Sequence, residues 1–177
     1  MSAATTTAAA AVRRTASVPA EIRFEIADLY AEYAACLDEG RFEEWPDFFT
    51  EDCTYKIVPR ENFDRGLPLC TVWAESRGML QDRVVGITQT MMYQPHYWRH
   101  VIGPLRIREA GGGDGDDAIG TEANYAVFRT MPDEPSEVFQ VGRYLDRIVR
   151  DDGRLKFREK LCVFDTLTIR NSLIYPV

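Results

Sequence analysis

The amino-acid sequence predicts an α+β fold in which N-terminal helices pack on one side of a curved, mainly antiparallel sheet. In the first half of the chain, apolar residues recur at spacings of three and four, the period of a helix face. In the second half, apolar and polar residues alternate over long runs separated by turn-like segments, as in strands. Helices followed by strands are typical of the α+β class. The length of 177 residues favours one domain, expected over residues 18–177 after a disordered tail at residues 1–17.

The first helix is predicted to begin near Pro19, since Ser17, Pro19 and Glu21 form a helix-start signal. Gly40 is expected to end this helix as a C-terminal cap. The apolar residues between these two signals fall on a single helical face. They are Ile22, Ile26, Leu29, Tyr30, Tyr33 and Leu37.

The remainder of the first half alternates between short elements. A second helix is predicted over residues 42–49, a strand over 53–57 and a loop over 59–66. A third helix is predicted over residues 71–84, with three apolar side chains facing inward. These inward-facing residues are Val72, Met79 and Leu80.

Five strands are predicted in the second half, and the last two alternate most clearly. Asp152-Gly153 between them is a strong signal for a two-residue hairpin turn. The Gly- and Asp-rich segment 111–117 fits a hairpin loop, because it lacks both a phosphate-loop lysine and the calcium-loop spacing. The predicted strands are 85–93, 97–109, 119–130, 137–150 and 155–170.

Charge and cysteine spacing exclude several functional classes. The net charge of −7 disfavours nucleic acids and anionic membranes as partners, because binding to these relies on clustered Lys and Arg. The four cysteines are widely spaced and form no CxxC motif, which excludes zinc-ribbon and thioredoxin-type sites. We expect them to be buried free thiols in a reducing cytoplasm, and no apolar run is long enough to span a bilayer. The cysteines are Cys36, Cys53, Cys70 and Cys162.

His96 and His100 are the only two histidines of the chain. On a helix, a spacing of four would place both imidazoles on one face, as in metal sites. The segment from Tyr97 onward is more typical of a strand, in which residues four apart are separated by about 13 Å. This distance is too long for a shared metal ion, so we interpret both histidines as structural or pocket residues. The sequence also contains no GxSxG motif for a nucleophile.

Several segments resemble the small (beta) subunits of Rieske-type aromatic-ring-hydroxylating oxygenases. Together they span residues 22–177 in order, and within the family they are most similar to salicylate 5-hydroxylase and terephthalate dioxygenase small subunits. The segments are Trp45-Pro-Asp-Phe-Phe-Thr-Glu-Asp-Cys-Thr-Tyr, Pro59-Arg-Glu-Asn-Phe-Asp-Arg-Gly-Leu-Pro-Leu-Cys, Met79-Leu-Gln-Asp-Arg-Val, Tyr93-Gln-Pro-His-Tyr-Trp-Arg-His, Leu161-Cys-Val-Phe-Asp-Thr and Asn171-Ser-Leu-Ile-Tyr-Pro-Val.

The resemblance implies a cone of the nuclear-transport-factor/ketosteroid-isomerase type and a role as a noncatalytic assembly subunit. It implies a catalytic large (alpha) subunit as partner, with three copies of each subunit in a complex that acts on an aromatic acid. The large subunit would hold the Rieske [2Fe–2S] cluster and the mononuclear Fe(II), and a reductase, often with a ferredoxin, would supply electrons from NAD(P)H. A Rieske cluster takes two histidines and a mononuclear site two more, so a chain with two histidines cannot build both.

An alternative from a different class stays open at the level of the sequence. A stand-alone isomerase or dehydratase of the same cone fold would need an acid or a histidine in its pocket as general base. Asp38, Asp52 and His100 are the candidates for that role. The aromatic residues of the first half could line such a pocket, or they could simply fill the core.

If the chain is an assembly subunit, aromatic and Arg-rich segments are candidates for the subunit interface, because obligate interfaces are enriched in these residues. Three segments have this composition: residues 73–77, residues 93–100 and the terminal residues 174–177. Trp98 and Tyr175 could instead be core residues. The candidate interface residues are Trp73, Arg77, Tyr93, His96, Tyr97, Trp98, Arg99 and Tyr175.

Overall fold

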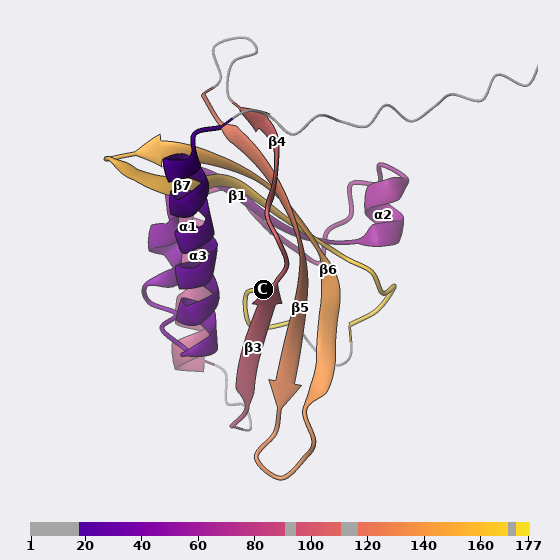
Figure 1. The fold of residues 1–177 in the computed structure, drawn as a ribbon. Coiled ribbons are helices and arrows are strands. Elements are labelled where there is room, and N and C mark those ends of the chain that lie inside the picture. The colour runs from indigo at the N-terminus through magenta and orange to yellow at the C-terminus, as the bar shows by residue number, and fades with distance from the viewer. Residues whose placement is uncertain (1–17, 91–94, 111–116, 170–172) are drawn as a thin grey trace, which may run out of the picture.

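The structure is a computed structural model that describes residues 18–90, 95–110, 117–169 and 173–177. The predicted tail at residues 1–17, most of the Gly- and Asp-rich segment and the candidate interface residue Tyr93 lie outside the described residues. Among the described residues, the α-helices lie in the first half of the chain and most of the long strands lie in the second half, which confirms the α+β prediction (Figure 1).

The first helix, α1 (Ala20–Asp38), matches the predicted span. Gly40 adopts φ +70° just beyond its end. The Gly40 N–H donates to the Leu37 carbonyl oxygen at 3.2 Å, and the Arg41 N–H donates to the Cys36 carbonyl oxygen at 2.9 Å. This pair of bonds is a Schellman motif, in which a residue without Cβ takes the left-handed position at no steric cost. The predicted inward face is buried at Ile26, Tyr30, Tyr33 and Leu37.

The segment after α1 is more extended than predicted. Only η1 (Trp45–Phe48) is helical within the predicted helix 42–49, and it is a 3-10 turn with Pro46 at its start. Phe49 already begins β1 (Phe49–Pro59), which is therefore much longer than the predicted strand 53–57. Phe49 and Trp45 are both fully buried, so packing of these rings outweighs the local helical pattern.

The predicted loop at 59–66 contains a short helix, α2 (Arg60–Asp64). Two ion pairs at a spacing of four support it, between Arg60 and Asp64 and between Glu61 and Arg65. The Pro59 ring sits just before the first turn, where no backbone donor is required. The loop prediction is wrong for these five residues, because a proline just before the first turn is compatible with a helix.

The predicted helix at 71–84 is two elements. Residues Val72–Ala74 form β2, whose Trp73 pairs with Lys56 of β1. The helix α3 (Arg77–Val85) begins only after Ser76, whose Oγ accepts a hydrogen bond from the Met79 N–H. Leu80 is buried as predicted, but Met79 is 45% exposed, so its predicted inward position is wrong. The cap at Ser76 shifts the start of the helix and thereby changes which side chains face the core.

The predicted strand at 85–93 is also wrong where the structure describes it. The chain continues from α3 into η2 (Gly86–Thr90), one turn of π-helix. The Thr88 hydroxyl donates to the Val84 carbonyl oxygen at 3.0 Å, and the Thr90 hydroxyl donates to the Gly86 carbonyl oxygen at 2.7 Å. Each hydroxyl bonds to the carbonyl oxygen four residues earlier, a contact typical of a coiled backbone and not of a strand.

The predicted strand 97–109 is interrupted and forms β3 (Tyr97–Ile102) and β4 (Arg106–Ala110). Pro104 lies in the gap between them, where the missing N–H of proline is tolerated. Both strands pair with β5 (Ile119–Thr130), whose span is as predicted.

The last two strands are β6 (Glu137–Asp151) and β7 (Arg154–Phe164), joined by the predicted hairpin. Asp152 and Gly153 have φ values of +49° and +77°, as a type I′ turn requires. The prediction for β6 is confirmed, whereas β7 ends six residues earlier than predicted.

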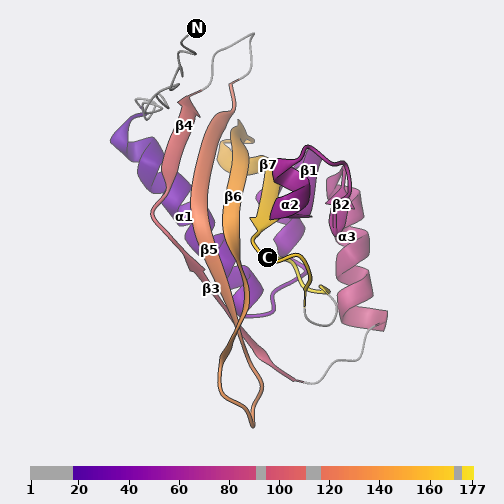
Figure 2. The ribbon, with the colours of Figure 1, turned by 90° about the vertical axis from the view of Figure 1, so that its right-hand side faces the viewer.

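The described strands form one sheet in the order β2-β1-β7-β6-β5-β3, with β4 also on β5. The pair β1–β7 is parallel, and the other pairs are antiparallel, which confirms the mainly antiparallel prediction. Figures 1 and 2 show a strongly curved sheet with α1 lying across its concave side. None of the helices among the described residues combines the length and apolar character that a membrane span requires.

Gly142 of β6 lies against the backbone of β7. A Cβ at this position would be 2.1 Å from the Val163 carbonyl oxygen, a contact that no side-chain rotation relieves. We predict that Gly142→Ala lowers the free energy of unfolding by about 1–3 kcal/mol, the usual cost of overpacking. Urea denaturation measures this change. The control is Gly86→Ala, where φ is −56° and nothing lies within 4 Å; equal losses for both variants would contradict the prediction.

Candidate functional site

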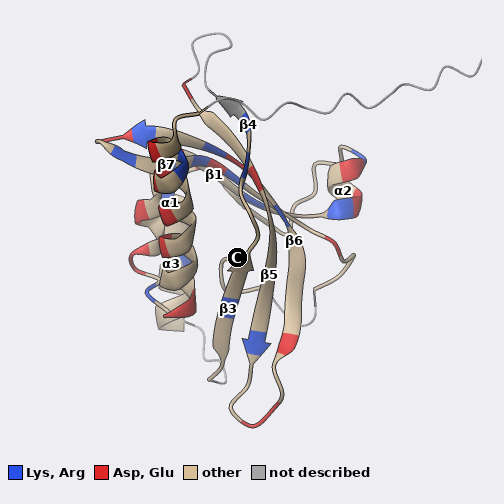
Figure 3. Ribbon diagram, viewed as in Figure 1, with Lys and Arg blue, Asp and Glu red and all other residues tan. Residues whose placement is uncertain are grey.

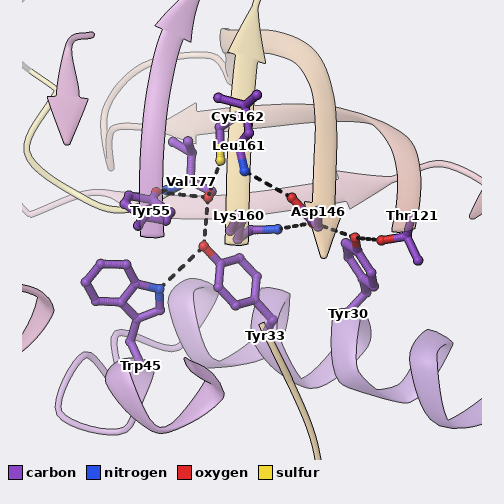
Figure 4. Close-up of polar contacts among 10 residues, drawn as sticks. All are labelled: Tyr30, Tyr33, Trp45, Tyr55, Thr121, Asp146, Lys160, Leu161, Cys162 and Val177. Atoms are coloured by element: carbon purple, nitrogen blue, oxygen red, sulfur yellow. Dashed lines mark hydrogen bonds and ion pairs between the residues drawn. The ribbon is translucent and has the colours of Figure 1, made fainter. Parts of the chain in front are cut away.

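The most deeply buried charges are a carboxylate and an ammonium on neighbouring strands of the sheet. Lys160 Nζ of β7 donates to Asp146 Oδ2 of β6 at 3.0 Å, and both side chains are fully buried. The Tyr30 hydroxyl of α1 donates to the same carboxylate oxygen and lies 2.8 Å from Thr121 Oγ1. The Leu161 N–H donates to Asp146 Oδ1 at 3.2 Å. Helix and sheet are therefore joined by one continuous polar network (Figure 4).

Aromatic rings complete the surroundings of Lys160. Burial raises the pKa of the Asp146 carboxyl, while the Lys160 charge and the hydrogen bonds that this carboxylate accepts act in the opposite direction. With neither side chain exposed, the pair has no access to a substrate, and we interpret it as structural. The distances from Nζ to the ring centroids are 3.6 Å for Tyr144, 4.4 Å for Phe157, 4.5 Å for Tyr33 and 4.9 Å for Tyr30.

Val177 lies next to this network, in the interior of the cone (Figure 4). Its carbonyl oxygen accepts hydrogen bonds from the Tyr33 hydroxyl at 2.8 Å and the Tyr55 hydroxyl at 3.2 Å. The Val177 N–H donates to the Tyr55 oxygen at 3.0 Å. Burial raises the pKa of both hydroxyls well above the usual value, so they stay protonated donors. The chain's own residues therefore occupy this part of the interior.

The candidate pocket residues separate into a pair and a single residue. His100 Nδ1 of β3 lies 2.6 Å from Asp38 Oδ1, at the last residue of α1. The His100 backbone N–H also donates to both Asp38 oxygens, at 3.0 and 3.1 Å. Asp52, by contrast, is exposed on β1 and lines a separate shallow polar pocket. The fold therefore brings Asp38 and His100 together and leaves Asp52 apart.

The candidate interface residues near the sheet edge are accessible. Trp73 of the edge strand β2 is 49% exposed, and Lys56 Nζ lies 4.3 Å from its ring centroid. Arg77 extends toward Glu51 and Asp47, with N–O distances of 3.3 and 3.9 Å. These contacts are at the protein surface, where an ion pair contributes little. Trp73 is therefore accessible to another chain, whereas the Arg77 side chain is only 30% exposed.

The candidates around β3 have two different positions. Tyr97 is 63% exposed and Arg99 is also exposed, both on the outer face of the sheet. Trp98 is only 9% exposed. The centroid of its ring lies 5.0 Å from that of His96 and 5.7 Å from that of Tyr175. The alternation along the strand sends Tyr97 and Arg99 outward and Trp98 inward.

The residues that could hold iron do not form a ligand set. Among the described residues, no three His, Cys, Asp or Glu side chains group closely enough to hold a metal ion. Cys36, Cys53 and Cys162 are buried free thiols, and burial raises their pKa values to about 11, 11 and 12. Cys70 is also a free thiol but is partly exposed, so the prediction that it is buried is wrong. Thiols with raised pKa values are poor metal ligands, since metals bind the thiolate. These residues do not fit a Rieske cluster.

The buried pair of Asp146 and Lys160 was missed by the sequence analysis. Both residues occupy inward-facing positions of alternating strands, where apolar side chains are expected. Opposite charges at inward positions of two adjacent strands are a sequence signal for a buried ion pair.

A family model described as a SnoaL-like domain matches residues 19–160. The anthranilate 1,2-dioxygenase small subunit of Burkholderia cepacia is 40% identical over 154 residues, which cover 87% of this chain and 93% of that protein. The chain belongs to the small subunits of aromatic-ring-hydroxylating dioxygenases. Subunit beta 2 of the terephthalate 1,2-dioxygenase terminal oxygenase component of Comamonas sp. is 36% identical over 153 residues, covering 86% of this chain and 97% of that protein.

Solved structures agree with this membership and confirm the expected cone fold. The beta subunit assigned to an aromatic-ring-hydroxylating dioxygenase of Novosphingobium aromaticivorans has a TM-score of 0.77 and 36% identity, covering 89% of this chain and 97% of that chain. A naphthalene 1,2-dioxygenase chain has a TM-score of 0.74 at 14% identity, covering 93% and 90%, which shows the fold alone. Membership of a small-subunit family implies a large catalytic subunit as partner.

The helix α1 of this small subunit is strongly acidic. The helix α1 carries five acidic residues and a single arginine, and Figure 3 shows these acids along its length. Nucleic-acid recognition relies on clustered Lys and Arg. The surface of α1 therefore has the opposite character from a nucleic-acid interface.

We predict that Lys160→Met lowers the free energy of unfolding by about 3–5 kcal/mol, because it leaves the Asp146 carboxylate buried without a counter-charge. The matched control is Lys156→Met, which removes a partly exposed pair with Asp151 and should cost about 0–1 kcal/mol. Chemical denaturation of both variants measures the difference. Similar, small losses in both would show that the buried pair does not hold the fold together.

Proposed function

We propose that this chain is the noncatalytic small subunit of a multicomponent Rieske non-haem iron oxygenase that hydroxylates an aromatic acid. Family membership is the observation that carries the proposal, since relatives at 35–40% identity are small or beta subunits of anthranilate and terephthalate 1,2-dioxygenases. The missing ligand set on the described part of this chain supports it as well. In this proposal the small subunit stabilises the assembly and the large subunit performs the reaction.

The partners proposed are a catalytic large subunit, with three large and three small subunits in the complex, and an electron-transfer chain. The large subunit would hold the Rieske [2Fe–2S] cluster through two Cys and two His, and the mononuclear Fe(II) through two His and a carboxylate. A reductase, with or without a ferredoxin, would deliver electrons from NAD(P)H. The buried free thiols support a reducing compartment, so we also propose the cytoplasm as its location.

The proposed substrate is an aromatic ring that bears a carboxylate, of the salicylate, terephthalate or anthranilate type. The names of the relatives with 35–40% identity support this class, because anthranilate and terephthalate are both aromatic acids. Choice among these acids belongs to the pocket of the large subunit. The alternative, a stand-alone isomerase or dehydratase, has no better support, since the curated relatives named here are dioxygenase subunits.

We propose that the surface around Trp73 is one of the contacts with another subunit. Exposed apolar side chains surround this tryptophan in the sequence, with Leu67, Leu69 and Met79 all more than 40% exposed. An exposed apolar patch on a soluble protein typically marks an interaction site, and these residues are the candidates for such a patch. Tyr97 and Arg99 on the outer face of the sheet are the second proposed contact. Behind this second contact, the Trp98 ring packs against His96 and Tyr175.

The first test of this proposal is the location of the iron. We predict that the purified small subunit binds no iron and oxidises no aromatic acid, whereas the co-purified complex shows a stoichiometric iron–sulfur signal. Metal analysis and visible absorption of the small subunit alone and of the complex provide the measurement. An iron–sulfur signal in the small subunit alone would contradict the assembly role.

The second test separates interface from core at two tryptophans. Trp73→Ala should reduce the fraction of assembled complex on gel filtration several-fold while leaving the melting temperature of the isolated subunit nearly unchanged, because the side chain is half exposed. Trp98→Ala should instead lower that melting temperature, since it removes a buried ring at a cost of about 3–5 kcal/mol. Normal assembly of the Trp73→Ala variant would place the interface elsewhere.

A further inference from the structure

A groove runs between helix α1 and the end of strand β3, and its lining includes Tyr30, whose hydroxyl donates to Asp146. One wall consists of the small side chains of α1, which extend no further than Cβ: Ala27, Ala31, Ala34 and Ala35. The other wall is apolar and comes from the segment 102–105. The groove has a volume of about 660 Å³, and Asp38 and His100 are among the residues that line it. It is therefore a mostly apolar slot with a polar pair in its lining.

Part of the Asp38–His100 contact has a structural explanation. β3 is an edge strand in this sheet, and its outward N–H groups need partners. The Asp38 carboxylate accepts the His100 backbone N–H with both oxygens and also contacts Nδ1. These three contacts attach the end of α1 to the strand edge. They account for Asp38 and for Nδ1 of the imidazole, but not for the second ring nitrogen.

The other ring nitrogen, His100 Nε2, is buried and has no hydrogen-bond partner among the described residues. The side chain as a whole is 2% exposed. Because the Asp38 carboxylate accepts, Nδ1 carries the hydrogen, and Nε2 of the neutral ring presents a lone pair. Buried polar atoms in folded proteins are nearly always paired, so this acceptor calls for a donor. The protein chain near the groove supplies none in the described residues.

We propose that this groove binds a small, flat, uncharged molecule whose hydroxyl group donates a hydrogen bond to His100 Nε2, as a phenol would. The alanine wall and the apolar wall opposite suit a flat apolar body. Asp38 gives the lining a negative charge, which disfavours a carboxylate ligand at the same place. Asp38 acts as a positioning residue, since it fixes the orientation and the tautomer of the imidazole. The proposal does not depend on the assembly role, because it concerns a binding site on this chain itself.

The test uses the full-length, isotope-labelled chain and three probes: phenol, its methyl ether anisole and benzoate. Amide chemical shifts of groove residues such as Ala31 and Leu105 report binding. We expect saturable shifts with phenol and an affinity for phenol about tenfold higher than for anisole, which has the same ring but no hydrogen-bond donor. A tenfold difference corresponds to one hydrogen bond of about 1.4 kcal/mol. Benzoate should bind more weakly than phenol. Equal responses to phenol and anisole, or no saturable response to phenol, would overturn the proposal.

Two variants locate the binding. His100→Leu should remove the preference for phenol over anisole. Since that variant also loses the contact with Asp38, Ala31→Leu provides a second probe that fills the groove and leaves the polar pair intact. It should weaken phenol binding at least fivefold, while the matched control Ala20→Leu, at an exposed position of the same helix outside the groove, should bind normally. Unchanged phenol binding in Ala31→Leu would place the ligand elsewhere and refute the site.

Discussion

The ion pair between Asp146 and Lys160 is the interaction on which the arrangement of helix and sheet depends. It joins β6 to β7, and the hydrogen bond from the Tyr30 hydroxyl to the same carboxylate joins both strands to α1. A buried pair gains little over apolar residues of the same size, because desolvation offsets the attraction between the charges. Its effect is on specificity: any shift of α1 or of the strand register would leave a buried charge without a partner. The four rings around Lys160 share this constraint, since they pack against its charge.

This constraint also explains why the chain is suited to a supporting role. Around the pair, buried tyrosines and Val177 bond to one another and occupy the inner part of the cone. Polar groups that are paired and inaccessible hold a structure rigid and do not act on a substrate. A rigid cone with exposed apolar residues near Trp73 and on the outer face of β3 is what a subunit needs when it must support a larger catalytic partner.

The Asp38–His100 pair differs from the buried ion pair in one respect. Each polar contact of Lys160 and Asp146 lies within the protein, whereas His100 keeps one nitrogen without a partner among the described residues, beside a groove. The Asp38–His100 pair therefore attaches the end of α1 to the strand edge and also leaves His100 Nε2 as an unused hydrogen-bond acceptor. The two pairs therefore differ in their capacity to bind a ligand, because the first is enclosed by aromatic rings and the second adjoins an open groove.

The sequence by itself determined the elements whose signals are local. The helical face from Ile26 to Leu37, the cap at Gly40 and the turn at Asp152-Gly153 each follow from neighbouring residues, and the structure agrees with them. The family followed from several short segments taken together. The count of two histidines also excluded the presence of both iron centres on this chain, because together they need four histidine ligands.

Only the tertiary structure decided the features that depend on distant residues. Phe49 became a strand residue because its ring is buried, and residues 72–74 became an edge strand because β1 offered hydrogen bonds to them. Asp38 and His100 are 62 positions apart, and Asp146 meets Tyr30 across 116 positions, so no local pattern could pair them. Their partners were chosen by the curvature of the sheet around α1, because burial of a polar group is tolerated only where the fold supplies its hydrogen bond.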